Sequence, residues 1–174
     1  MTKKTVLSRE EINKRVAELG REITGDYQGK KLILVGVLNG AFIFMADLAR
    51  AIDLEVEIDF IRVASYGLSS TSSGQITLSK DVELDLTDKD VLLVEDIIDT
   101  GRTIAFLKEY FGRTKAGSVK ICALIDKKER REVEVKTDYA GFAMSEGFLV
   151  GYGLDFAEQY RQLPEIYHLE NPQG

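Results

Sequence analysis

The sequence has little cysteine and no long apolar run, and each shortage narrows what the protein can be. Its single cysteine, Cys122, excludes an intramolecular disulfide bond and favours a reducing compartment. No apolar stretch approaches the roughly 20 residues that span a bilayer. Residues 1–4 lead into polar sequence without the apolar region of a signal peptide. We therefore expect a soluble cytoplasmic protein that has no membrane partner.

Basic residues are outnumbered by acidic ones. The chain has 23 Lys and Arg residues against 29 Asp and Glu residues, which gives a formal net charge of −6. General nucleic-acid binders are usually basic, so we expect no nucleic-acid partner. An anionic small ligand is still compatible with this charge, because backbone N–H groups and Mg²⁺ can hold an anion locally.

The length and composition fit a single globular domain. The chain has 174 residues, of which 44% are hydrophobic and 30% are charged. It is long enough for one proper core and too short for two ordinary domains. Because it shows neither internal repeats nor a linker, we expect one domain over residues 1–174.

Hydrophobic periodicity predicts helices that alternate with strands. Ser8 and Glu11 form a capping-box pattern ahead of a helix over roughly residues 8–23. A second, largely apolar helix is predicted over residues 41–52, and a third from Gly101 onward. The predicted strands cover residues 32–37, 56–64, 76–78, 91–94, 119–125, 148–150 and 166–167. This alternation indicates an α/β fold with a mostly parallel sheet and helices on both faces.

Residues 65–74 form the low-complexity stretch of the chain. Six of these ten residues are Ser or Thr and two are Gly. This composition predicts a mobile loop, which we expect to become more ordered when ligands bind. The alternative is a disordered surface loop without a role.

The most informative segment is residues 91–103, Val-Leu-Leu-Val-Glu-Asp-Ile-Ile-Asp-Thr-Gly-Arg-Thr. A buried strand is predicted to end at two adjacent acids, and a third acid precedes small hydrogen-bonding residues at a helix start. Ligands of open α/β sheets bind beyond the carboxyl ends of the strands, and free N–H groups at a helix N-terminus favour a phosphate. Gly101 lets the backbone approach the anion, and the hydroxyls of Thr100 and Thr103 add donors. The segment therefore predicts a cradle for a phosphate monoester.

The adjacent acids Glu95 and Asp96 suit a different part of a ligand. Carboxylates accept hydrogen bonds from vicinal hydroxyls, and they coordinate Mg²⁺ directly or through water. A solvated acidic turn is the alternative for any one of these acids. The whole string nevertheless favours a phosphate-and-ribose site, because every position in it suits one.

Residues 91–103 resemble the signature with which type I phosphoribosyltransferases bind phosphoribosyl pyrophosphate (PRPP). The resemblance extends from about Leu32 to Arg161, which is most of the chain. Asp99-Thr100-Gly101 is similar to the acid-Thr-Gly sequence of the hypoxanthine-guanine branch of this family. Members that are specific for adenine or orotate lack an acid at this place. The resemblance therefore implies an enzyme that acts on 6-oxopurines.

The same resemblance implies an architecture, a cofactor and an assembly. It implies the type I phosphoribosyltransferase fold, with a core over about residues 32–145. A small hood for the base would be formed from the C-terminal segment together with the N-terminus. The cofactor would be Mg²⁺, and the chain would form a homodimer or homotetramer, as is usual in the family.

The resemblance also assigns three sets of site residues. PRPP and its phosphates would be bound by Leu38, Asn39, Gly40, Ser65, Tyr66, Glu95, Asp96, Asp99, Thr100, Gly101, Arg102, Thr103 and Arg161. The purine would be bound by Lys127, Phe148, Leu149 and Asp155. Mg²⁺ would be held by Glu95, Asp96 and Asp155.

Several of these residues have a simpler alternative or depart from the family pattern. Lys127 would contact the exocyclic oxygen of the purine, but a solvated lysine after a strand is the ordinary interpretation. Phe148 would stack on the purine and the backbone of Leu149 would read the base edge, whereas core packing explains Phe148 equally well. Better-known members carry lysine where this chain has Asn39, so only the backbone amides of residues 38–40 are expected to contact pyrophosphate.

The implied reaction transfers the phosphoribosyl group from PRPP to N9 of hypoxanthine or guanine. The C1′–O bond breaks with oxocarbenium-like character, and N9 attacks from the opposite face and inverts the configuration. A 6-oxopurine must lose a proton from N7 as N9 attacks, and Asp99 would accept it. Catalysis would then consist of positioning and charge stabilisation, without a protein nucleophile.

Two functions from other classes compete with this one. A receiver-type signalling domain also has acids after an apolar strand, but its acid pair lies near the N-terminal strand. A regulator that keeps the fold but binds nucleic acid without catalysis should show a basic face and lose Asp99 or Lys127, whereas both residues are present and the chain is acidic. The single histidine, His168, and the single cysteine, Cys122, are interpreted as structural.

Overall fold

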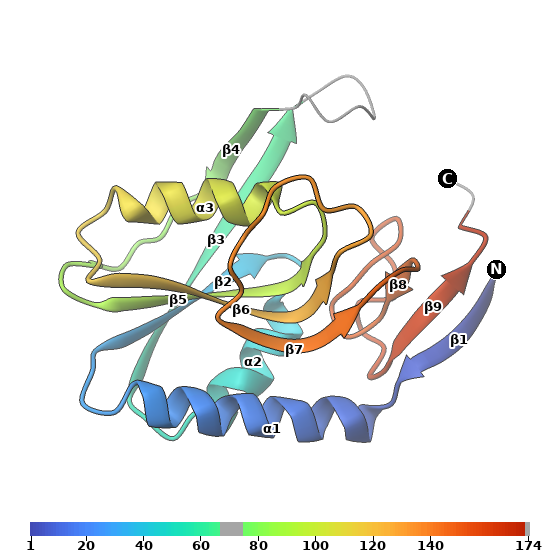
Figure 1. Cartoon of the computed structure of the whole chain (residues 1–174), viewed down its shortest axis with the longest axis horizontal. Coiled ribbons are helices and arrows are strands. Elements are labelled where there is room, and N and C mark those ends of the chain that lie inside the picture. Colours follow the sequence, from blue (N-terminus) through green and yellow to red (C-terminus); the bar gives the residue numbers. More distant parts are fainter. Residues whose placement is uncertain (67–74, 173–174) are drawn as a thin grey trace.

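The central sheet of the protein is six-stranded and mostly parallel. The computed structural model describes residues 1–66 and 75–172. The strands of this sheet are β2 (Leu32–Leu38), β3 (Val56–Tyr66), β4 (Gln75–Lys80), β5 (Asp90–Ile98), β6 (Ser118–Lys127) and β7 (Tyr139–Met144). Their order is β4-β3-β2-β5-β6-β7, and only the β3–β4 pair is antiparallel (Figure 1). β2 and β5 lie at the centre, so their carboxyl ends meet at one edge of the sheet.

Three helices cover the two faces of this sheet, as the alternating pattern predicted (Figure 1). Helices α1 (Arg9–Asp26) and α2 (Phe42–Ala51) pack on one face, and α3 (Arg102–Gly112) packs on the other. The predicted capping box at the start of α1 is present, because the Ser8 side chain accepts from the Glu11 N–H and the Glu11 carboxylate accepts from the Ser8 N–H.

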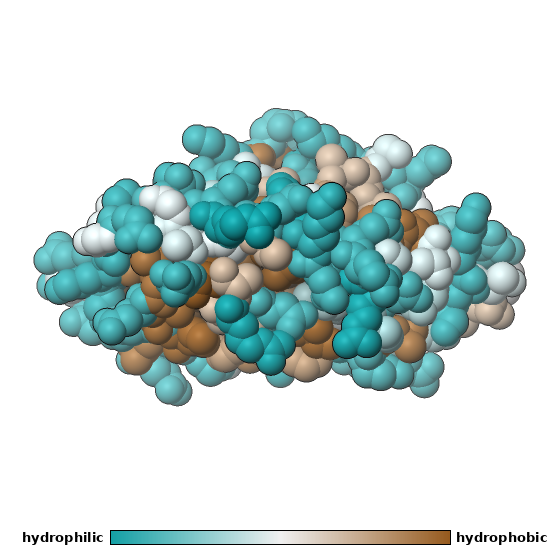
Figure 2. Space-filling model, turned by 90° about the horizontal axis from the view of Figure 1, so that it is seen from below, coloured by the Kyte–Doolittle hydropathy of each residue, from teal (hydrophilic) through white to brown (hydrophobic). Residues whose placement is uncertain are grey.

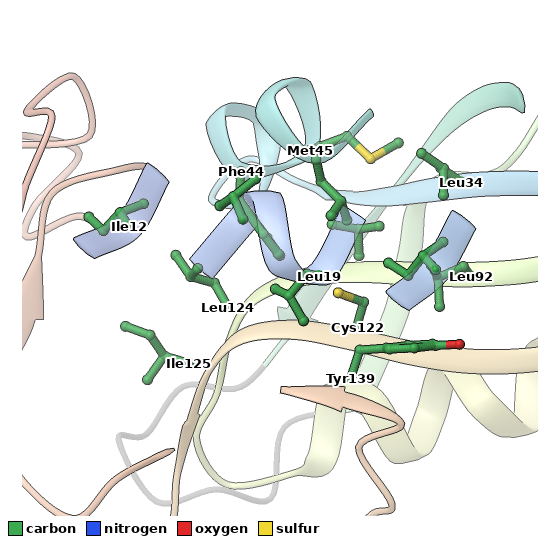
Figure 3. Close-up of a cluster of buried hydrophobic side chains, with 14 of the residues drawn as sticks. Ile12, Leu19, Leu34, Phe44, Met45, Leu92, Cys122, Leu124, Ile125 and Tyr139 are labelled. Atoms are coloured by element: carbon green, nitrogen blue, oxygen red, sulfur yellow. The ribbon is translucent and has the colours of Figure 1, made fainter. Parts of the chain in front are cut away.

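Alternate residues of the central strands divide the core into two clusters. In β2, Leu34 packs toward α1 and α2, whereas Ile33 and Val35 pack toward α3. β5 repeats the pattern, with Leu92 in the first cluster and Leu93 in the second. Figure 3 shows the first cluster, in which side chains of α1 and α2 meet those of the sheet. The alternation follows from the two-residue period of a strand, and burial on both sides explains why residues 32–37 and 91–94 are continuously apolar.

A second, smaller sheet joins the two ends of the chain. It contains β1 (Thr2–Leu7), β8 (Leu149–Val150) and β9 (Ile166–Glu170) in the order β1-β9-β8. Both pairs are antiparallel, and the N- and C-terminal segments therefore lie side by side (Figure 1). The sole histidine, His168, lies in β9 and pairs with Lys4 and Leu149 in the register of this sheet.

Some boundaries differ from those predicted. β5 does not end before the two acids but continues to Ile98, because Glu95 pairs with Ala123 and Ile97 with Ile125 of β6. β1 and β7 were missed, since their inward and outward positions do not alternate in hydrophobicity.

The predicted loop at residues 65–74 is only partly described. Ser65 and Tyr66 belong to β3 and pair with Ile76 and Gln75 of β4. The predicted return strand at residues 76–78 is therefore confirmed as part of β4. Residues 67–74, on which the prediction of mobility falls, lie outside the described residues.

The surface is mixed in character. Figure 2, which views the molecule from below the orientation of Figure 1, shows mostly hydrophilic side chains with hydrophobic patches between them. Within residues 1–66 and 75–172, no helix is both long and apolar enough to cross a membrane.

Candidate active site

Two adjoining cavities lie at the carboxyl ends of the central strands. The larger one has a volume of about 300 Å³. It is lined by Val37, Leu38, Gly40, Val63, Glu95, Asp96, Ile97, Ile98, Asp99, Thr100, Gly101, Thr103, Ile104, Asp155 and Arg161. The smaller one has a volume of about 180 Å³. It is lined by Asp96, Ile97, Asp99, Lys127, Arg130, Phe148, Leu149, Leu154 and Asp155.

The two cavities form one site, because they share four lining residues. These are Asp96, Ile97, Asp99 and Asp155. The larger cavity contains the start of α3. The smaller cavity contains the aromatic and positively charged side chains that were assigned to the purine. A ligand with a phosphorylated end and a planar end can therefore occupy both, with the shared carboxylates between them.

Glu95 and Asp96 are buried carboxylates at the edge of the larger cavity. They are 6% and 9% exposed. The Asp96 N–H donates to Glu95 Oε1 (3.0 Å), and the Ile97 N–H donates to Asp96 Oδ1 (2.8 Å). Burial raises the pKa of Glu95, and the neighbouring Asp96 carboxylate raises it further. A cation or a set of hydroxyl donors would stabilise this pair.

Asp99 lies at the junction of the two cavities, and one of its oxygens is unused. Arg130 Nη1 donates to Asp99 Oδ2 over 3.3 Å. Asp99 Oδ1 is buried and has no hydrogen-bond partner among the described residues. A buried acceptor without a partner costs free energy, so this oxygen is suited to receive a proton or hydrogen bond from a ligand.

The start of α3 supplies backbone donors to the larger cavity. Gly101 is the N-cap residue with φ 86°, and no side chain of residues 1–66 or 75–172 caps the helix. The N–H groups of the first helical turn are therefore free of side-chain partners, except that the Arg102 N–H donates to Thr100 Oγ1 (3.3 Å). The arrangement matches the predicted phosphate cradle, because residues 99–101 and 103 line the cavity.

Two details of this cradle change the interpretation of its residues. The Arg102 side chain forms an ion pair with Glu132 (Nε to Oε2, 2.6 Å) rather than lining either cavity. A Cβ atom at Gly101 would overlap the carbonyl oxygen of Val133. Glycine is thus required by its positive φ and by packing against residue 133, in addition to any approach of an anion.

Leu38 and Gly40 also line the larger cavity, on a loop that approaches other parts of the site closely. The Leu38–Asn39 peptide bond is cis. A Cβ atom at Gly40 would overlap the Asp96 carboxylate, and one at Gly153 would overlap the Gly40 carbonyl oxygen. Two glycines therefore bring the loop close to both the carboxylate pair and the segment after β8. The Asn39 side chain is exposed.

Arg161 and Asp155 close the larger cavity from the C-terminal side. Arg161 Nη1 donates to the Gly153 carbonyl (2.7 Å), and Nη2 lies 3.5 Å from Asp155 Oδ1. Asp155 Oδ2 accepts from the Glu158 N–H (2.9 Å). The structure thus brings together an arginine and a carboxylate that are far from β5 in the sequence.

The smaller cavity holds the residues assigned to the purine. Lys127, at the end of β6, is only 7% exposed, and its Nζ lies 3.4 Å from Glu129 Oε2. The solvated-lysine alternative is therefore wrong. Phe148 is 38% exposed and meets Phe156 edge to face at 5.5 Å, so it is not a core residue. Its exposed ring and the buried Leu149 line the cavity.

Three assigned residues do not line either cavity in the described part of the chain. These are Asn39, Ser65 and Arg102. The side chain of Tyr66, which was also assigned to PRPP, lies outside the described part. Conversely, sequence reasoning missed the apolar wall of Val37, Val63 and Ile104, and it missed Arg130 beside Asp99. Apolar wall residues carry no signal that distinguishes them from core, and Arg130 lies within a run of charged residues that is typical of a solvated turn.

The carboxylates fit Mg²⁺ when a phosphorylated ligand is present. Among residues 1–66 and 75–172, no group of three or more His, Cys, Asp or Glu side chains could hold a metal ion by itself. Mg²⁺ is usually bound by one or two carboxylates together with substrate phosphates and water, rather than by a complete protein cage. Glu95, Asp96 and Asp155 around the larger cavity satisfy that requirement.

Comparison with known proteins agrees with this geometry. The family described as phosphoribosyl transferase domain matches residues 3–157. The chain belongs to this family. It is 48% identical to the hypoxanthine-guanine phosphoribosyltransferase of Bacillus subtilis, over 94% of this chain and 91% of that protein. It is 46% identical to the enzyme of the same name from Aquifex aeolicus, over 97% of this chain and 95% of that protein.

Solved structures of the same family have the same fold. A hypoxanthine phosphoribosyltransferase from Staphylococcus aureus superposes with a TM-score of 0.92 at 41% identity, covering 96% of this chain and 91% of that one. A hypoxanthine-guanine phosphoribosyltransferase from Bacillus anthracis, with a HEPES molecule in its active site, has a TM-score of 0.92 at 43% identity, covering 97% of this chain and 99% of that one. The predicted family and fold are thus confirmed.

Proposed function

We propose that the chain transfers the 5-phosphoribosyl group of PRPP to N9 of hypoxanthine or guanine and releases pyrophosphate. The products are IMP or GMP, and the role is purine salvage. One observation carries the proposal: Asp99 stands between a phosphate cradle and a cavity with Lys127 and Phe148. The names of the relatives that share most of this chain support the same reaction.

PRPP would occupy the larger cavity. Its 5′-phosphate lies at the start of α3, where backbone N–H groups and the hydroxyls of Thr100 and Thr103 donate to it. Its ribose hydroxyls donate to the Glu95 and Asp96 carboxylates. Its pyrophosphate lies between the backbone of residues 38–40 and Arg161. When bound, Mg²⁺ neutralises the pyrophosphate and makes it a better leaving group.

The purine would occupy the smaller cavity. Phe148 stacks on the ring, and the Lys127 ammonium donates to the 6-oxo group. A 6-amino group offers this ammonium no acceptor, so the cavity favours 6-oxopurines over adenine. Asp99 Oδ1 accepts the N7 proton as N9 attacks C1′ from the face opposite the departing pyrophosphate. The residues thus act by positioning and by stabilising charge.

The assembly and the compartment belong to the same proposal. We infer a homodimer or homotetramer in the cytoplasm, because the family usually forms such assemblies and the sole cysteine, Cys122, is buried and free. Light scattering on the purified chain measures the mass of the assembly.

A turnover screen tests the proposed reaction. The protein is incubated with PRPP, Mg²⁺ and one of hypoxanthine, guanine, xanthine, adenine, uracil or orotate, and nucleotide and pyrophosphate are measured. Hypoxanthine should give IMP and guanine should give GMP, and each nucleotide should appear with an equal amount of pyrophosphate. No turnover with any base would instead favour a regulator that keeps this fold without catalysis.

A further inference from the structure

Arg131 is a buried arginine within a run of charged residues. Residues 127–132 read Lys-Lys-Glu-Arg-Arg-Glu, which is typical of a solvated turn. The side chain of Arg130 is 67% exposed, as such a turn requires, but that of Arg131 is only 8% exposed. A buried guanidinium must be satisfied by acceptors, since it cannot lose its charge.

The acceptors of Arg131 belong to the ends of two strands. Its Nε donates to the Asp99 carbonyl (3.0 Å), and its Nη2 lies 3.3 Å from the Ile98 carbonyl. The same Nη2 lies 2.5 Å from Asp126 Oδ1 and 3.1 Å from the Lys127 carbonyl. One side chain therefore connects the backbone of Asp99, after β5, to the backbone of Lys127, at the end of β6.

The residues after Arg131 hold the same loop from a second side. The N–H groups of Glu132 and Val133 both donate to the Thr100 carbonyl, at 2.9 and 3.0 Å. The Val133 carbonyl and the Cδ of Arg131 occupy the space next to Gly101. The segment 131–133 is thus packed against the whole turn that carries Asp99 into the phosphate cradle.

We infer that Arg131 is a positioning residue that fixes Asp99 relative to Lys127. The two groups act on neighbouring atoms of one purine, N7 and the 6-oxo oxygen, so their separation must match the ring. In the described part of the chain Arg131 lines neither cavity, and its side chain donates instead to the backbone carbonyls of Asp99 and Lys127. The inference rests on the proposed function. Displacement of a reacting group by about 1 Å can lower the rate about 10²-fold.

A double-mutant cycle tests the inference. Arg131→Lys keeps the charge but cannot reach acceptors on both strand ends, so kcat with hypoxanthine should fall about 10-fold. In the Asp99→Asn background the same substitution should lower kcat by less than about threefold, because the group that it positions no longer accepts a proton. The KM for PRPP should change less than kcat. Thermal unfolding confirms that each variant is folded.

Two further variants keep the test decisive. Arg113→Lys is the matched control, since Arg113 is exposed and pairs only with Glu109 among the described residues; its kcat should equal that of the parent. Asp126→Asn weakens the Arg131 contact without changing Arg131, and kcat should fall about two- to fivefold. This second variant decides the matter if Arg131→Lys does not fold.

The outcomes separate the inference from the proposed function. Equal losses of kcat in the parent and in the Asp99→Asn background, or an Arg131→Lys or Asp126→Asn variant with unchanged kcat, would overturn the inference while the reaction stands. An unmutated protein that forms no nucleotide from PRPP and hypoxanthine would overturn the proposed function, and the inference with it.

Discussion

Two strands of the central sheet carry buried carboxylates in opposite circumstances. Asp59 of β3 is 7% exposed and accepts from the N–H groups of Phe60 (2.7 Å), Glu83 (2.7 Å) and Leu84 (2.9 Å). Lys80 Nζ lies 3.6 Å away. Burial opposes ionisation of Asp59, but these N–H donors outweigh it and its pKa is lowered. The carboxylate holds the segment before β5 in place.

The carboxylates of β5 and the turn after it have fewer such partners among the described residues, since Glu95 and Asp96 each accept from one backbone N–H. Glu95 is buried next to Asp96. Burial is the main cause that raises the pKa of Glu95, and the like charge of Asp96 raises it further. Asp99 Oδ1 has no hydrogen-bond partner in the described part of the chain. A carboxylate fully satisfied by its own protein stabilises the fold, whereas carboxylates with spare acceptor capacity around a cavity are suited to a ligand. The comparison predicts that substitutions in the two regions affect different quantities.

The largest expected effect is on turnover in Asp99→Asn. The substitution keeps the shape of the side chain but removes the proton acceptor, so kcat should fall about 10²-fold. Binding of PRPP, measured by calorimetry, should change little, because the proposed phosphate site is the start of α3 rather than the Asp99 side chain. Unchanged turnover would show that Asp99 is only a residue of the turn.

Asp59→Asn should affect stability rather than turnover. The substitution removes the negative charge that accepts three N–H hydrogen bonds. The free energy of unfolding should therefore fall by about 1–3 kcal/mol at pH 7. Since the folded pKa of Asp59 is lowered, its contribution is fully present above the unfolded value of about 3.9 and is lost as pH falls through the folded value. Urea unfolding at pH 7 and at pH 3 measures both statements. A stability difference that persists unchanged at low pH, or a kcat loss as large as that of Asp99→Asn, would break the comparison.

Phe148→Ala should have the smallest of the three effects and separate the two cavities. Removing a stacked ring should weaken binding of the base and the nucleotide about 10-fold. PRPP affinity should remain within about twofold, since Phe148 lines only the smaller cavity. Equal losses for PRPP and for the nucleotide in calorimetry would argue against separate subsites.

The sequence predicted the parts of the site that are local in the chain. The apolar run of β5, the three acids and the glycine before α3 follow one another within residues 91–103, so their chemistry can be read directly. The capping box of α1 and the buried strands β2 and β6 were equally readable. These elements depend on local hydrogen bonds and on burial. Both leave a signal in the amino-acid composition and in the hydrophobic periodicity of the segment.

The remaining features depend on contacts between distant segments. Arg131 reads as one more charge in a polar run, and only the fold shows that it is buried between β5 and β6. Arg102 reads as a phosphate ligand, but Glu132 holds its side chain. The need for glycine at position 40 comes from the Asp96 carboxylate, which is far away in the sequence. No period or propensity carries this information.

The ratio of kcat/KM for hypoxanthine to that for adenine tests the central claim most directly. Both values are measured on one preparation with saturating PRPP and Mg²⁺. If Asp99 and Lys127 together recognise a 6-oxopurine between the two cavities, hypoxanthine should be favoured by at least about 10²-fold, because adenine leaves the buried ammonium without its acceptor. Comparable values for the two bases would contradict the account.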